Sequence, residues 1–200
     1  DALTVTLRGG GYTNAAFAAA PLLAPNVSGG LTKLGSGTLT LGGASTYGGE
    51  TVISNGTLKL GNALALPAAS KVLLAGGTFD LGGYTVTNAV GGLGTIANGT
   101  LQTVISPAGE GALGTESFTL NGATLAGTYR CDVTAAGASD HVTFAGPTDL
   151  SGLTLEIVDA AALSRTKTYT VATLTGARTG TFTLDSQLDS RWHLAYAADG

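Results

Sequence analysis

Residues 29–60 read GGLTKLGSGTLTLGGASTYGGETVISNGTLKL, a run of short alternating segments separated by glycine. In 38–41 (TLTL) and 57–60 (TLKL), leucines alternate with threonine or lysine. A period of two over four to eight residues is typical of a β-strand with one buried face. The flanking glycines and the Asn-Gly pair allow the positive φ angles that sharp corners need. The stretch therefore predicts short strands joined by tight corners, and the glycine cluster GGLG at 91–94 is interpreted as another corner.

A similar five-residue motif recurs along the chain. Its copies are GTLTL (37–41), GTLKL (56–60), GTFDL (77–81) and, more weakly, GTLQ (99–102) and SFTL (117–120). The first apolar residues of these copies are Leu39, Leu58, Phe79, Leu101 and Phe118, at steps of 19, 21, 22 and 17 residues. A period near 20 is typical of solenoids, whose units must stack because none can bury its own apolar face. Twenty residues suit one three-sided coil of a parallel β-helix.

The stretch 29–60 closely resembles the autotransporter-associated β-strand repeat, which occurs in passenger domains of bacterial autotransporters and related surface proteins. Lys33, the Gly35/Gly37 pair, Thr46-Tyr47 and the second Gly-Thr-Leu all fall in register with it. A looser similarity covers residues 122–200, which look like the closing section of such passengers. The resemblance implies a right-handed parallel β-helix on the bacterial cell surface, associated with the outer membrane through a region outside these 200 residues.

The sequence divides into three parts. Residues 1–28 carry a strand-like segment and an Ala-rich stretch expected to cap the first coil. Residues 29–121 hold the coils. Residues 122–200 concentrate aromatic residues, including Trp192, and predict a β-structured C-terminal cap. The fold class predicted is thus all-β, a right-handed parallel β-helix with an N-terminal and a C-terminal cap.

Composition excludes several classes of protein. The net charge is −4, only 11% of residues are charged, and the basic residues are scattered singly, so we do not expect a nucleic-acid partner. The hydrophobic fraction of 44% supplies material for a core. No apolar run of some 18 residues occurs, so we expect no direct membrane insertion by this segment.

Few residues offer chemistry. Ser139-Asp140-His141 contains the residue types of a hydrolase triad, but neighbours on a strand point to opposite faces, so we interpret Asp140 as a turn acceptor. His193 alternates with apolar neighbours and is expected to face solvent. Cys131 is expected to be a buried filler, with an intermolecular disulfide as the alternative. The two histidines and one cysteine lack metal-ligand spacing, so we predict no catalytic residues, metal or cofactor.

Two non-catalytic interpretations remain open, and a third is favoured least. In the first, the chain is an extracellular structural stalk whose coils project other surface or adhesive domains of its parent protein. In the second, it is the subunit of an extracellular fibre, whose strand with Leu3, Val5 and Leu7 pairs with another copy, because open sheet edges invite pairing. The third, a β-helical polysaccharide-active enzyme, needs clustered carboxylates, whereas the 13 acidic residues are spread almost singly.

Overall fold

The protein is described from a computed structural model, which covers all residues except 1–4, 8–28, 108–112, 159, 186–192 and 197–200. The regular structure of the described part consists of β-strands, apart from a single 3-10 helix, η2 (Ala160–Ala162). Its strands are β1 (Val5–Leu7), β2 (Leu31–Lys33), β3 (Thr38–Leu41), β4 (Thr51–Ile53), β5 (Thr57–Leu60), β6 (Val72–Asp80), β7 (Thr85–Val86), β8 (Val90–Ile105), β9 (Thr115–Cys131), β10 (His141–Ala145), β11 (Thr148–Asp149), β12 (Leu153–Ile157), β13 (Ala172–Leu174), β14 (Arg178–Thr179) and β15 (Thr183–Leu184).

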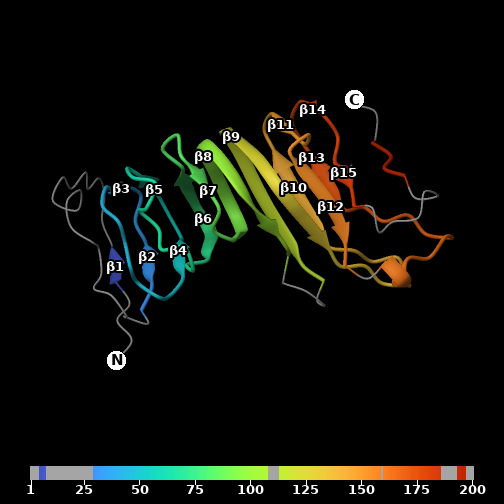
Figure 1. The fold of residues 1–200 in the computed structure, drawn as a ribbon, viewed down its shortest axis with the longest axis horizontal. Coiled ribbons are helices and arrows are strands. Elements are labelled where there is room, and N and C mark those ends of the chain that lie inside the picture. The colour runs from blue at the N-terminus through green and yellow to red at the C-terminus, as the bar shows by residue number, and fades with distance from the viewer. Residues whose placement is uncertain (1–4, 8–28, 108–112, 159, 186–192, 197–200) are drawn as a thin grey trace.

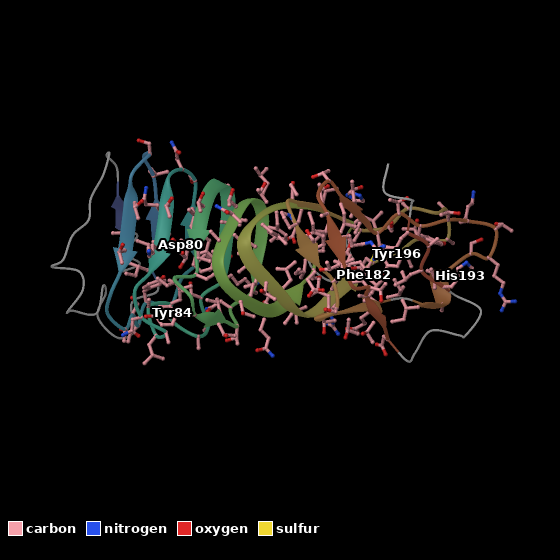
Figure 2. The ribbon with its side chains drawn as sticks, turned by 90° about the horizontal axis from the view of Figure 1, so that it is seen from above. Asp80, Tyr84, Phe182, His193 and Tyr196 are labelled. Carbon is pink, nitrogen blue, oxygen red and sulfur yellow. The ribbon has the colours of Figure 1, made fainter. Side chains whose placement is uncertain are left out.

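All pairings between these strands are parallel. Thirteen strands form one sheet, in which β1-β2-β4-β6-β8-β9-β10-β13 is the main path, and β11 pairs with β14 separately. Because β6, β8 and β9 each contribute to more than one face, the sheet wraps around a central core. The stack extends along one axis from β1 to β15, and β8 and β9 curve around it (Figures 1 and 2). This arrangement is consistent with the predicted β-solenoid.

Repeated apolar side chains fill the interior of the stack. One column follows the register Leu39↔Leu58↔Phe79↔Ile96↔Leu120, and all five side chains are at most 4% exposed. Their neighbours alternate outward, as the burial pattern of β5 shows. The prediction of alternating buried leucines in 38–41 and 57–60 is therefore confirmed.

The predicted repeat positions after Phe79 are wrong, because the observed register places other residues in the column. Leu101 pairs with Val86 and Leu125 on another side of the coil, and Phe118 pairs with Gly94 and Phe144. The equivalent positions after Phe79 are Ile96 and Leu120, so the successive steps are 19, 21, 17 and 24 residues. The offset between β6 and β8 is 18 residues at Ala75↔Leu93 and 17 at Thr78↔Thr95, and the fourth step includes the residues between β8 and β9.

The glycine cluster expected to form a corner lies inside a strand. Gly91 and Gly92 belong to β8 and pair with Leu73 and Leu74 of β6. Gly92 has a φ of 96°, so the strand bends there without ending. The cluster GGLG at 91–94 thus bends one continuous strand around the core.

The C-terminal part continues the parallel stack. The expected division between residues 121 and 122 falls inside β9, whose ladder with β8 runs from Ser117 to Tyr129. After β12 and η2, the next strand, β13, begins at Ala172. Leu3, most of segment 1–28 and Trp192 lie outside the described residues.

No helix in the described ranges is long and apolar enough to cross a membrane.

Candidate functional site

A buried lysine occupies the corner between β2 and β3. Lys33 is 3% exposed, and its Nζ donates hydrogen bonds to the backbone oxygens of Leu34 (3.0 Å), Gly35 (2.7 Å) and Asn55 (3.2 Å). Two of these oxygens belong to its own corner and the third to the equivalent corner of the next coil. Backbone oxygens at a corner cannot all join the ladder, so the ammonium satisfies groups that would otherwise be buried unpaired. Lys33 therefore links two successive corners.

The fit around the ammonium depends on a glycine. Gly56 has a φ of 66°, and a Cβ there would lie 2.7 Å from Lys33 Nζ and 2.4 Å from Gly35 O. Any side chain would displace the ammonium or the corner beside it. Burial lowers the pKa of Lys33, because the charged form loses water contacts. Its three carbonyl partners offset part of that cost.

A second polar network lies inside the same coil. Tyr47 is 1% exposed, and its hydroxyl shares a hydrogen bond of 2.6 Å with Thr51 Oγ1. Thr51 Oγ1 in turn lies 3.0 Å from Ser70 Oγ, which donates to Gly49 O at 2.9 Å. This network links Thr51 of β4 to Ser70, which precedes β6 on the adjacent coil. Buried hydroxyls that are fully paired fix one arrangement of the coils.

Residues 31–60 match the family model of the passenger-associated-transport-repeat. The match agrees with the resemblance seen in the sequence. Comparison of the chain with curated proteins and with solved structures gave no match. The repeat accounts for the first two coils, and Lys33, Tyr47 and Gly56 are the residues through which it holds them together.

The Ser139-Asp140-His141 motif outside the repeat does not converge. Asp140 is fully buried and accepts hydrogen bonds from the backbone nitrogens of Gly114 (2.7 Å) and Asp132 (2.9 Å). Ser139 Oγ donates to Thr170 O, and His141 Nε2 bonds to Thr173 Oγ1 at 2.9 Å. Each side chain thus serves a different segment. Asp140 is thus a backbone acceptor, but its donors are 8 and 26 residues away, so the predicted role in a local turn is not what the structure shows.

A second carboxyl points into the stack near Asp140. Glu116 shares the inward face of β9 with Phe118, and its Oε1 lies 3.3 Å from Gly92 N on the preceding coil. The other oxygen, Oε2, has no hydrogen-bond partner within the described ranges. Burial first, and the nearby charge of Asp140 in addition, raise the pKa of Glu116 to about 7. A Cβ at Gly91 would lie 2.6 Å from Oε1, so glycine makes room for this carboxyl.

Cys131 lies beside these carboxyls and is fully buried, as predicted. Its Sγ contacts the backbone oxygens of Asp132 (3.6 Å) and Asp140 (3.7 Å). Burial raises the pKa of the thiol to about 12, so it stays protonated and unreactive at neutral pH. Within the described ranges, no group of three His, Cys, Asp or Glu residues is placed to hold a metal ion.

The C-terminal end of the stack carries aromatic contacts. Phe182 packs against Tyr129 with ring centroids 6.3 Å apart, and its backbone nitrogen donates to Tyr196 Oη at 2.9 Å. The guanidinium of Arg178 lies 4.3 Å from the centroid of the Tyr196 ring. Figure 2 shows Phe182, Tyr196 and His193 grouped at this end. His193 is exposed, as alternation predicted.

The candidate self-assembly strand is described only in part. Val5 and Leu7 belong to β1, which pairs in parallel with β2 through Val5↔Leu31 and Leu7↔Lys33. Leu3 lies outside the described residues. Among the described strands, β1 is the last on its end of the sheet path, and β2 is its partner. β1 therefore extends the ladder of the repeat by one strand.

Sequence reasoning missed two of the buried polar residues. Lys33 follows Leu31 at a spacing of two on the same strand, which placed it on the inner face, and β2 has the burial pattern to match. Glu116 precedes Phe118 and Leu120 by the same alternation. The signal was present in both cases, but charged residues are rarely buried, so alternation alone did not identify them.

Proposed function

We propose that this chain is a non-catalytic structural segment of an extracellular passenger in an autotransporter-like bacterial surface protein. Its coils form a stalk that holds other domains of the parent protein away from the cell. The match of residues 31–60 to the passenger-associated-transport-repeat carries this proposal. The continuous parallel ladder from β1 to β13 supports it, because stacked coils resist bending and extend in one direction.

The proposed coil is right-handed, because parallel strands joined by crossover connections have that hand almost without exception. The family name associates the repeat with the transport of passengers. We infer that coils locked by Lys33 and Tyr47 give the exported chain an early folded unit outside the cell. Each coil contacts only its neighbours, so such a unit can form before the rest of the passenger arrives.

Surface display tests the proposal. The chain is placed between a signal peptide and an autotransporter membrane barrel in a Gram-negative host, and intact cells are probed with antibody and with protease. The proposed function predicts that the chain is accessible on intact cells. The matched control without the barrel should stay inside the outer membrane. A barrel that inserts while the chain remains inaccessible would contradict the proposal.

A second candidate is a subunit of an extracellular fibre. The position of β1 at the end of the sheet path favours it, because an outer strand offers backbone groups to a second copy. Electron microscopy of the purified chain with and without residues 1–11 separates the two candidates. Filaments that disappear on deletion support the fibre, and single particles in both samples support the stalk.

A further inference from the structure

The dipeptide Asn-Gly occurs three times in the chain. Asn98-Gly99 and Asn121-Gly122 lie inside the long strands β8 and β9. Asn55-Gly56 lies in the corner between β4 and β5, inside the repeat, and Asn55 is exposed. Asn98 and Gly122 are left out of the β8–β9 register and have φ angles of 53° and 67°, so these two dipeptides also lie at bends. Of the three, Asn55-Gly56 is the one whose peptide oxygen accepts from Lys33.

The corner dipeptide is folded back on itself. The backbone nitrogen of Gly56 donates to Oδ1 of Asn55 at 2.7 Å, so this nitrogen lies against the side-chain amide of the preceding residue. The neighbouring ladder bonds are made by Thr57 N, which donates to Gly37 O, and by Gly56 O, which accepts from Thr78 N. For Asn98 and Asn121 the structure gives no such contact to the following nitrogen among the described residues.

The buried ammonium is adjacent to the same peptide bond. Lys33 Nζ donates to the backbone oxygen of Asn55 at 3.2 Å, and this oxygen shares its peptide unit with the nitrogen of Gly56. Loss of the proton from Gly56 N leaves a negative charge that is spread onto that oxygen. A cation hydrogen-bonded to the oxygen stabilises the charge, as a donor stabilises a developing oxyanion. Its burial strengthens the effect, because little water screens it.

We propose that Asn55-Gly56 is a self-modification site at which the folded repeat promotes deamidation through Lys33. Gly56 N, having lost its proton, attacks Cγ of Asn55 and forms a five-membered succinimide. The bond between Cγ and Nδ2 breaks, and the nitrogen leaves as ammonia after taking up a proton. Water then opens the ring. Attack at Cγ gives aspartate, and attack at the former backbone carbonyl gives isoaspartate.

The product changes the corner in two ways. Either form of residue 55 adds a carboxylate close to the ammonium of Lys33, whose three described partners are uncharged carbonyls. The isoaspartate form also lengthens the main chain by one atom between β4 and β5. The longer corner strains the pairing of Thr57 with Thr38. Chains that carry isoaspartate at residue 55 should therefore lose the pairing between β3 and β5 more easily. The modification is independent of the proposed stalk function.

Peptide mass spectrometry of the purified chain, incubated folded at mildly alkaline pH, tests the proposal. Conversion is followed as a gain of one mass unit at each of the three sites, and isoaspartate is separated chromatographically. Residue 55 should convert about tenfold faster than Asn98 and Asn121 in the same molecules, which corresponds to about 1.4 kcal/mol of transition-state stabilisation. Equal rates at the three sites would overturn the proposal.

Two further measurements separate the contribution of the fold from that of local sequence. In urea the preference for residue 55 should disappear, and a preference that persists would assign it to sequence alone and overturn the proposal. In Lys33→Met, conversion at residue 55 should slow while the other two sites keep their rates. Unchanged conversion in a Lys33→Met chain that retains its β-structure would contradict the role of the ammonium. Asn55→Gln serves as the unreactive control.

Discussion

The two ends of the stack solve the same packing problem with different residues. The repeat in 31–60 uses strands of three or four residues, a leucine column and corners tied by Lys33 and Tyr47. The rungs built on β9 use strands of up to 17 residues and place aromatic rings in the core. Phe118 packs against Phe144 with ring centroids 6.3 Å apart. The comparison teaches that corner chemistry stabilises the first coils and core volume stabilises the last.

Truncation of a core ring should have the largest effect. Phe118→Ala removes a fully buried ring that contacts Phe144 and should lower the free energy of unfolding by about 3–5 kcal/mol. Because coils contact only their neighbours, amide hydrogen exchange should rise in 115–157 and change less in 31–60. Leu58→Ala is the matched control and should reverse this pattern. A uniform rise along the whole chain in both variants would show that the ends are not separable.

The second prediction concerns pH and is specific to the C-terminal rungs. The pKa of Glu116 is about 7 in the folded chain, whereas a freely solvated glutamate has a pKa of 4.5, so the folded state keeps a proton that the unfolded state has lost. The free energy of unfolding therefore falls as pH rises from about 5 to about 7, by up to about 3 kcal/mol, and no further change comes from this group above that range.

Urea denaturation at pH 5 and pH 8 measures this effect. Glu116→Gln should remove most of the difference, since the amide does not titrate. The pKa of Asp140 is also raised, by burial first, so its contribution has the same sign and is present in both proteins. An equally steep pH dependence in Glu116→Gln would contradict the inward position of this carboxyl.

The third prediction compares two lysines of the repeat. Lys33→Met leaves three corner carbonyls without their charged donor and should cost about 2 kcal/mol. Lys59→Met removes only an exposed side chain 3.8 Å from Asp80 and should cost less than about 0.5 kcal/mol. Chemical denaturation of both variants gives the two values. Equal values would show that the corner contact contributes nothing beyond an ordinary surface lysine.

The smallest effect is expected for the surface ion pairs of the two regions. Arg130 donates to both carboxylate oxygens of Glu156 at 2.9 and 3.1 Å, whereas Lys59 and Asp80 make a single longer contact. Double-mutant cycles should give a measurable coupling for the first pair and a coupling close to zero for the second, and salt should weaken the first. A larger coupling for Lys59 with Asp80 would reverse the comparison.

The sequence predicted the first region better than the second. In 31–60, glycines and alternation mark every corner and strand, and the column from Leu39 through Phe79 follows directly. Beyond Phe79 the corners vary in length. The similar sequence motif at Leu101 therefore lies on a different side of the coil, where Leu101 pairs with Val86. Period counting assumes equal corners, and this assumption fails where a bulge or an inserted loop changes one corner without breaking the ladder.

The candidate site was predictable only in outline. Cys131 as a buried thiol follows from alternation, whereas Asp140 accepts from Gly114 and Asp132 rather than within the local turn that its sequence suggested. The contact of Lys33 with Asn55 could not be predicted, because it joins coils 22 residues apart and depends on their stacking. Glu116 was missed for the same reason, since Gly91 and Gly92 leave space for it only when the coils are in register.

Disulfide trapping tests the parallel stack most directly. The register Thr40↔Lys59 places two outward positions side by side on adjacent coils, about 4.8 Å apart as neighbouring strands are. Thr40→Cys with Lys59→Cys should therefore oxidise to a disulfide, whereas Thr38→Cys with Lys59→Cys should not, because that diagonal is too long for the bond. Cys131 is fully buried in both variants. Efficient trapping of the diagonal pair and none of the direct pair would contradict the parallel register.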